Sequence, residues 1–527
     1  MYAITVGLFV VIYFLVIPIA KYFYDPKGLR RYPNFYALSG ISDLPFLYEA
    51  QRGFRSRNLF EAHKKHPVLR IGPNALSYSD PSAIKDIYGH GTNCVKDRFY
   101  SETGGTHAHL ADVVDKKDHA RKRKVLSSAY AVKNLEEWEF KVANVASKVI
   151  KAFDKRCTDP LLSDTTPSKE DLTVDYRNWT VLFAAAAIAN IGLSEDLGFL
   201  DEGLDVVKSE SKDGVVKEVS FRECHGATGT VSYQLVWSYD WFKTFKRMSK
   251  IFSSGYRKMW KLDGDWGGIV YHRATTRLNR YLAGEKLDDF FTAMMEDKNG
   301  DPHNLEWGEI VAEINIMMNA GHDTTAISLR NSMFFLLKNP KCLEKLRGEL
   351  DGVLDEDEVV ASYSKVKHLP YLRACIDESL RMLPPVIFGL PRRTPMEGTA
   401  ILGDFVAGDT SVSMSAYVVH HQESIFENHD TYKPERWLGE EGKSLQPYFI
   451  PFSTGARGCI GRNISYLEQT VLVASLIHRF DFALPSPDWN PPVRETTNLS
   501  PGPMPIKVWK RVFSVLPRWV AEKNVVM

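Results

Sequence analysis

The sequence lacks the features that divide a chain into several domains or draw it to nucleic acid. It has no internal repeat, and no long Gly/Ser-rich or Pro-rich linker follows the first forty of its 527 residues. Its formal net charge is only +1, so there is no global basic field. Hydrophobic residues make up 44% and charged residues 25%, as in proteins with a sizeable core. We therefore expect one large folded domain and no nucleic-acid partner.

Cysteine is scarce and widely spaced. The chain has six cysteines, namely Cys94, Cys157, Cys224, Cys342, Cys375 and Cys459. They include no C-x-x-C pair and lack the density typical of small secreted domains held by disulfides. This usage favours a reducing compartment.

Charge is absent from residues 3–20, which read AITVGLFVVIYFLVIPIA and just suffice in length to cross a bilayer. A cleavable signal peptide is the alternative, but the basic start and the small-x-small cleavage site of such peptides are missing. Lysines and arginines follow the run, so the positive-inside rule places the rest of the chain on the cytoplasmic side. We expect a transmembrane anchor over residues 1–22, a stiff proline-containing linker over 23–45 and one folded domain over 46–527.

Helical patterns dominate the body of the chain. Residues 68–78 read as two short strands around a Gly-Pro-Asn turn, and residues 386–414 hold further strand-like pieces. Most other long stretches read as helices. The clearest helix covers residues 304–338 with Asn304 as its N-cap, and a second covers 371–383 between prolines. The predicted class is mainly α with a minor β portion.

A glycine-rich loop around Cys459 carries the strongest chemical signal. Residues 452–461 read FSTGARGCIG between a strand-like YFIPF segment and an apolar helical pattern. A thiolate that ligates iron must be exposed on a turn, and small neighbours let a flat macrocycle approach it. Arg457 can pair with a carboxylate of such a cofactor. The alternative is an ordinary buried cysteine before a helix. The pattern favours Cys459 as an iron ligand.

These ten residues resemble the haem-binding signature of the cytochrome P-450 superfamily, in which a cysteine thiolate is the fifth iron ligand. The resemblance covers nearly all of the chain from about residue 28 onward. It implies the cytochrome P-450 fold, haem b as cofactor and Cys459 as its axial ligand. It also implies that Phe452 and Gly461 lie beside the haem.

Four other segments resemble family motifs and follow in the family's order. Residues 320–325 (AGHDTT) resemble the oxygen-activation motif and imply catalytic roles for Asp323 and Thr324. Gly321 of this motif is expected to clear space where the helix passes over the haem. Glu378-Ser-Leu-Arg381 resembles the E-x-x-R pair, which Arg436 of the Pro-Glu-Arg-Trp segment would complete. The alternatives are a polar spot in a long helix for the first motif and an ordinary surface ion pair for the second.

The fourth segment, residues 119–123, stands where the family has W-x-x-x-R, but His119 replaces the tryptophan. The resemblance implies that Arg123, Arg457 and Arg392 bind the haem propionates, with Arg393 as the alternative to Arg392. It leaves open whether His119 also contacts a propionate. The segment could instead be a solvated helix face. Five further basic residues could then face an acidic flavoprotein reductase, namely Lys116, Lys117, Arg121, Lys122 and Lys124.

Three segments, residues 88–100, 118–130 and 388–395, resemble fungal microsomal enzymes, notably the benzoate para-hydroxylase group and related secondary-metabolite oxidases. The resemblance implies an endoplasmic reticulum membrane protein with one span, its catalytic domain in the cytosol. It implies an NADPH-dependent reductase as partner and a mostly apolar small molecule as substrate, without identifying that molecule. The alternatives are a haem-thiolate isomerase or dehydratase that uses no O2, and a non-enzymatic haem-binding membrane protein. Expected substrate contacts, with plain core packing as the alternative, are Phe99, Tyr100, Ala320, Val386 and Phe388.

Overall fold

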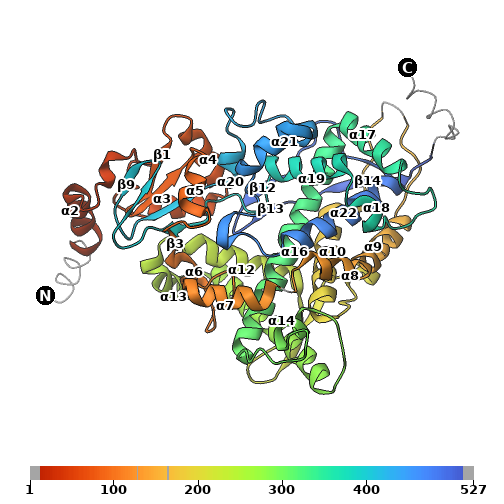
Figure 1. Cartoon of the computed structure of the whole chain (residues 1–527), viewed down its shortest axis with the longest axis horizontal. Helices are drawn as coiled ribbons and strands as arrows, with labels where there is room; N and C mark the ends of the chain where they lie inside the picture. Colours follow the sequence, from red (N-terminus) through yellow and green to blue (C-terminus); the bar gives the residue numbers. More distant parts are fainter. Residues whose placement is uncertain (1–11, 128, 163–164, 514–527) are drawn as a thin grey trace.

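The computed structural model describes residues 12–127, 129–162 and 165–513, and it is mainly helical with a minor β portion, as predicted. A small β-rich part holds the N-terminal end of the described chain, and a larger helical part holds most of the rest (Figure 1). The main helices are α7 (Lys116–Ser127), α9 (Glu139–Asp154), α10 (Tyr176–Leu193), α12 (Phe221–Leu235), α14 (Ser254–Leu282), α16 (Trp307–Lys338), α19 (Pro370–Met382) and α22 (Arg462–Arg479).

A five-stranded sheet joins segments that are far apart in the sequence. Its order is β1 (Val68–Gly72), β2 (Ala75–Tyr78), β10 (Ser411–Met414), β7 (Arg392–Arg393) and β3 (Val95–Lys96). The strands β1 and β2 form the predicted antiparallel hairpin, and β10 joins it in parallel. In the β3–β7 pair, Lys96 lies opposite Arg392. The sheet therefore sets two buried cations side by side.

The predicted strands within 386–414 are confirmed as β7, β8 (Thr399–Ile401), β9 (Asp404–Val406) and β10. The strand expected before the cysteine loop is not formed. The chain there makes a short 3-10 helix, Gln446–Tyr448, and then irregular backbone. An apolar run of five residues with a proline inside it does not require a strand.

The long helix α16 crosses the middle of the helical part (Figure 1). It begins later than predicted, because Glu306 is its N-cap and forms a capping box with Glu309. Asn304, the predicted cap, has a left-handed φ of 54° and lies outside the helix. The helix α19 begins at Pro370 itself, in the first-turn position that proline favours.

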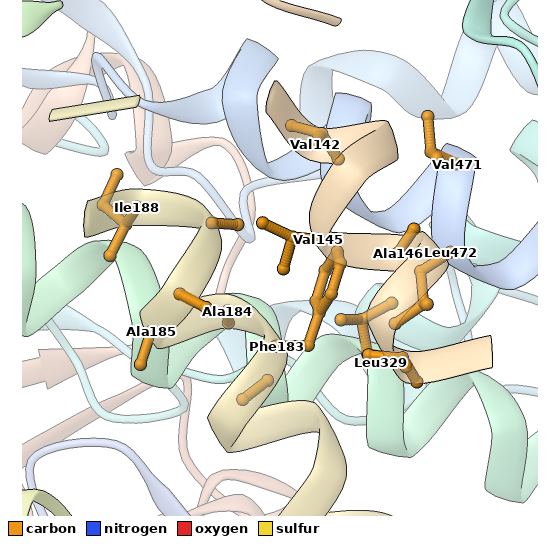
Figure 2. Close-up of a cluster of buried hydrophobic side chains, with 14 of the residues drawn as sticks. Val142, Val145, Ala146, Phe183, Ala184, Ala185, Ile188, Leu329, Val471 and Leu472 are labelled. Carbon is orange, nitrogen blue, oxygen red and sulfur yellow. The ribbon is translucent and has the colours of Figure 1, made fainter. Parts of the chain in front are cut away.

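The main core lies where α9, α10, α16 and α22 meet. Val145 of α9, Phe183 of α10, Leu329 of α16 and Val471 of α22 point into it (Figure 2). Residues 184–187 of α10 are four consecutive alanines, all buried. Their small side chains let α10 pack closely against α16, which carries much of the functional site.

The predicted membrane anchor lies only partly within the described chain. Residues 12–16 form a single π-helical segment, followed by α2 (Ile17–Tyr24), whereas residues 3–11 of the predicted span lie outside the described residues. From residue 12 onward, no described helix combines the length and the apolar character that a bilayer crossing needs. The predicted linker packs on the sheet, since Leu29 is buried and Asn34 bridges to Arg70.

Candidate active site

Residues 452–461 form a tight loop that presents Cys459 directly before α22. The Cys459 backbone N–H donates to the Phe452 carbonyl (2.9 Å), which closes the loop. Gly455 has a left-handed φ of 69°, and a Cβ atom there would overlap the Tyr88 carbonyl oxygen. Only glycine satisfies both constraints. A Cβ on Gly461, by contrast, would meet only the edge of the Tyr130 ring at 3.8 Å, so the surface beside the thiol is open.

Cys459 differs from the other five cysteines, which are buried or half-buried, because its side chain is exposed. Burial by surrounding protein nevertheless raises the pKa of its thiol, while the backbone N–H of Gly461 and the charge of Arg123 lower it. The exposed thiol therefore lies in a recess and not on the outer surface. This geometry does not match the alternative of a fully buried cysteine.

Five cationic or titratable side chains from four segments of the chain gather at this loop. Burial lowers the pKa of His119 to about 4, and four positive charges around it add to the effect. The neighbouring charges are those of Arg457, Lys96, Arg123 and Arg392. Since all four act on one imidazole, they form a single group, here named the cation cluster and comprising Lys96, Arg123, Arg392 and Arg457.

The cation cluster is held by neutral partners. Arg123 donates from Nη1 to the Gly458 carbonyl (3.0 Å), and Arg457 donates from Nη1 to the Val113 carbonyl (2.7 Å). Among the described residues, no carboxylate oxygen lies within 4.0 Å of a charged nitrogen of the cluster. Burial and the charge of Arg392 accordingly lower the pKa of Arg457 to about 10. The cluster is a partly buried positive charge with no paired carboxylate among the described residues, and the more distant charges of Asp112 and Asp115 offset it in part at Lys96 and Arg457.

The two adjacent arginines of β7 have different surroundings. Arg392 donates from Nη1 to the Tyr100 hydroxyl (3.2 Å) and belongs to the cation cluster. Arg393 instead pairs with Asp97 (3.0 Å) and Asp409 (2.8 Å). Its charge is therefore compensated by protein carboxylates, and the alternative that Arg393 replaces Arg392 does not match the structure.

Lys96 was not among the predicted site residues; it is buried and donates from Nζ to the Ala111 carbonyl. Burial and the charges of Arg392 and Arg457 hold the pKa of Lys96 well below its ordinary value. A lone lysine in a short strand gives no signal in the sequence, because only the β3–β7 pairing brings it to the site. An exposed thiol in a recess beside an uncompensated cation cluster fits haem b, which offers iron and two carboxylates.

A cavity of about 410 Å³ lies between α12, α16 and the β12–β13 hairpin (Val493–Glu495, Leu499–Pro501). Asp323 and Thr324 line it. Thr324 donates from its hydroxyl to the Ala320 carbonyl (2.8 Å), and Asp323 accepts from the Asn498 side-chain amide (2.7 Å). The five expected substrate contacts all line this cavity as well, namely Phe99, Tyr100, Ala320, Val386 and Phe388.

Gly321 has a packing role that differs from the expected one. It was expected to clear space where the helix passes over the haem. A Cβ atom at this position would lie 2.7 Å from Cγ1 of Ile188 on α10. The glycine therefore lets α10 approach α16, which the sequence of α16 alone does not reveal.

Glu378, Arg381 and Arg436 form one buried ion-pair group. Arg381 binds Glu378 with two parallel hydrogen bonds of 2.9 Å, and Arg436 donates from Nε to the same carboxylate (3.1 Å). All three side chains have at most 1% exposure, so the alternative of a surface pair does not match. Trp437 donates from its indole N–H to Glu378 (2.9 Å), and Lys433 donates from its backbone N–H (3.0 Å).

The basic segment of α7 is only partly available to a partner. Lys122 is buried and pairs with Glu309 (2.7 Å) and Glu313 (3.7 Å), so it cannot face a reductase as expected. Those two carboxylates lie nearly two hundred residues further along the chain. The basic residues of α7 alone therefore did not indicate that Lys122 is paired. The residues of this segment that remain exposed are Lys116, Lys117, Arg121 and Lys124.

The polar end of the cavity holds two histidines that the sequence analysis did not single out, His225 of α12 and His322 of α16. Their ring centroids lie 4.3 Å apart. Burial lowers the pKa of His322 to about 3, and the neighbouring His225 adds to this effect. His322 is therefore neutral near neutral pH.

Comparisons with known proteins agree with this geometry. The family model described as Cytochrome P450 matches residues 33–508. The chain is 28% identical to benzoate 4-monooxygenase bphA of Aspergillus niger over 92% of each chain. It is 30% identical to a cytochrome P450 monooxygenase of Aspergillus terreus, covering 86% of this chain and 90% of the relative. A cytochrome P450 monooxygenase of Hormonema carpetanum, efuB, is 28% identical over 91% of each chain. The chain thus belongs to the cytochrome P450 family, and it is a monooxygenase whose cofactor is haem b with an axial cysteine thiolate.

Proposed function

We propose that this enzyme oxidises a mostly apolar small molecule, of an aromatic or secondary-metabolite type, with O2 and electrons from an NADPH-dependent reductase. The observation that carries the proposal is one cavity lined both by Asp323 and Thr324 and by the aromatic side chains of Phe99 and Phe388. When bound, haem b supplies the activation of O2. The protein supplies the pocket, the proton route and the binding of the cofactor.

Cys459 is the proposed axial ligand. Its support is the exposed thiol in a recess, the loop closed by the Phe452 carbonyl, and the open surface beside Gly461. The cation cluster is the proposed binding site of the two propionates, because a buried group of positive charges without carboxylate partners gains most from two bound carboxylates. His119 lies within the field of these charges and is neutral, so it can donate one hydrogen bond to a propionate.

Asp323 and Thr324 are the proposed route for protons into the cavity. The carboxylate of Asp323 can hold a proton at the oxygen that Asn498 leaves free. The hydroxyl of Thr324 currently donates to the Ala320 carbonyl, and rotation about its χ1 angle can redirect that hydrogen bond into the cavity. Both residues line the cavity, so the carboxylate and the hydroxyl open onto the same space.

The lining of the cavity indicates the substrate class. Phe99, Tyr100, Val386 and Phe388 give the cavity an aromatic and apolar part, and polar side chains such as His225, Asn319 and Asp323 line another part. A pocket of this kind binds a flat or apolar body and orients it through a few polar groups. The name of one relative, benzoate 4-monooxygenase, makes aromatic acids the first compounds to test.

Membrane attachment through residues 1–22, on the cytosolic side of the endoplasmic reticulum, remains part of the proposal. Its support is the uncharged run over residues 3–20 followed by basic residues. The reductase is proposed to dock on the exposed basic residues of α7. Lys116, Lys117 and Lys124 lie on the same segment as Arg123 of the cation cluster, so an electron donor bound there would be close to the cofactor.

The proposal is tested by reconstitution with reductase. Candidate aromatic acids, phenols, prenylated indoles and polyketides are screened first for a substrate-induced change of the haem spin state. For each hit, NADPH consumption, O2 consumption and product are then measured together. We expect product that depends on all three components. Product formed from a peroxide without O2 or NADPH would indicate an isomerase or dehydratase instead.

A further inference from the structure

We infer that His225, His322 and Asp323 form a binding site for Zn2+ at the polar end of the active-site cavity. One ligand atom from each residue lies within 4.8 Å of the others, and all three side chains line the cavity. Two histidine nitrogens and one carboxylate oxygen are the donor set of many zinc sites with three protein ligands and an open fourth position. The cavity that these residues line has a volume of about 410 Å³, which can hold a water molecule as the fourth ligand.

The two histidines are already oriented as metal ligands usually are. His322 donates from Nδ1 to the Met318 carbonyl (2.6 Å), which leaves Nε2 with its lone pair. His225 makes its hydrogen bond from Nε2 to the Asn319 side-chain oxygen (3.0 Å), which leaves Nδ1. Histidines that bind metals almost always donate their other ring N–H to a carbonyl or carboxylate. Each ring therefore has one nitrogen fixed by the protein and one available to the ion.

Asp323 has the matching arrangement. Its Oδ2 atom accepts from the Asn498 side-chain amide (2.7 Å), which fixes the carboxylate and leaves Oδ1 available. Asn498 belongs to the turn of the β12–β13 hairpin, whereas His225 belongs to α12. The site thus brings together three elements of the fold.

The charges around the site favour a moderate affinity for Zn2+. The hydrogen bond from Nδ1 of His322 to the Met318 carbonyl leaves the lone pair of Nε2 for a cation. Asp323 contributes one negative charge. Arg177 lines the same cavity and its positive charge acts on His322, which opposes a cation. Arg222 also lines the cavity, but its charge is compensated by Asp205 at 3.3 Å. Removal of the Arg177 charge is therefore expected to strengthen zinc binding.

The test measures Zn2+ binding to the haem-loaded enzyme by isothermal titration calorimetry. We expect His225→Gln and Asp323→Asn each to weaken binding at this site by at least about tenfold, since loss of an outer partner alone costs about 10–100-fold. Asn319→Ala removes only the hydrogen-bond partner of His225, and it is expected to weaken zinc binding by about 10–100-fold. Arg177→Gln is expected to tighten it. The proposal would be overturned if the zinc-binding isotherms of all three variants, His225→Gln, Asp323→Asn and Asn319→Ala, coincided with the isotherm of the unmodified enzyme.

A second group of side chains, outside the cavity lining, supplies the control. His421, His429 and Asp430 also bring ligand atoms within 4.8 Å of one another, and Asp430 is exposed. His429→Gln removes this group and is expected to leave binding at the cavity site unchanged. Retention of the red-shifted carbon monoxide spectrum shows that each variant is folded around its haem.

Zinc is also expected to slow turnover over the concentration range in which it binds, because the ion holds the Asp323 carboxylate. This consequence rests on the proposed role of Asp323, whereas binding does not. Zinc that binds through His225 without slowing turnover would support the metal site and contradict the proton route. The two proposals can therefore fail separately.

Discussion

Lys96 lies directly opposite Arg392 in the antiparallel β3–β7 pair, so the register of the two strands holds two buried basic side chains next to each other. Such a pair destabilises the protein on its own and is stabilised by a bound anion. We predict that Lys96→Met gives a holoenzyme that releases haem to apomyoglobin roughly 10–100-fold faster, because a hydrogen bond to a charged group contributes about 1.5–3 kcal/mol. The haem-free variant is expected to be at least as stable as the unmodified protein.

Lys116→Met provides the matched control, since Lys116 is an exposed lysine of the neighbouring helix. It should leave the rate of haem release unchanged. Equal rates for Lys96→Met and the unmodified enzyme would show that Lys96 makes no contact with the cofactor.

The second prediction concerns the buried group of Glu378, Arg381 and Arg436. Arg381→Ala leaves the Glu378 charge with fewer partners in a fully buried site, at a cost of about 3–5 kcal/mol. We expect little haem-loaded protein from this variant and from Glu378→Ala, measured as holoprotein yield per cell mass. Lys443→Ala breaks an exposed pair of the same i,i+3 spacing with Glu440 and should leave the yield unchanged. A normal yield from Arg381→Ala would contradict the structural role of this group.

The third prediction concerns proton delivery. Thr324→Ala removes the hydroxyl but keeps the helix, so the variant should bind haem and consume NADPH with reductase while much of the flux goes to hydrogen peroxide. Thr324→Ser keeps the hydroxyl and should restore most of the coupling. Asp323→Asn should lower the rate of turnover itself. Product formed per NADPH is the quantity to measure, and unchanged coupling in Thr324→Ala with an unchanged rate in Asp323→Asn would remove both residues from the mechanism.

The fourth prediction concerns membrane attachment. Deletion of residues 1–24 should move the protein from the integral membrane fraction to soluble or peripherally bound forms, with haem incorporation largely intact. Fractionation with carbonate extraction makes this measurement. An unchanged integral distribution would show that residues 3–20 are not the anchor.

Features that depend on local sequence were predictable. The 68–78 hairpin and the helix around Asp323 have a clear turn signal or helical period, and the structure contains both. The loop at Cys459 was recognisable because its glycines and its arginine lie at fixed spacings within ten residues. The family, the monooxygenase activity and the cofactor, all expected from these motifs, are confirmed by the comparisons.

Features that depend on pairing between distant segments were not predictable. Lys96 enters the cation cluster only through the register of β3 against β7. Lys122 was predicted to be exposed, but it is buried and pairs with Glu309 and Glu313 of α16. Gly321 was assigned to the cofactor because nothing in α16 reveals that Ile188 of another helix presses against it. In each case the deciding contact comes from a residue more than one hundred positions away.

The most direct test of the account is the carbon monoxide spectrum of the reduced enzyme, because sulfur donation from Cys459 to the iron shifts the Soret band to longer wavelength. We predict this band for the unmodified protein and its complete loss in Cys459→Ala and Cys459→His. Cys342→Ala, at a half-buried cysteine outside the loop, should retain it. Persistence of the red-shifted band in Cys459→Ala would contradict the assignment of Cys459 as the axial ligand.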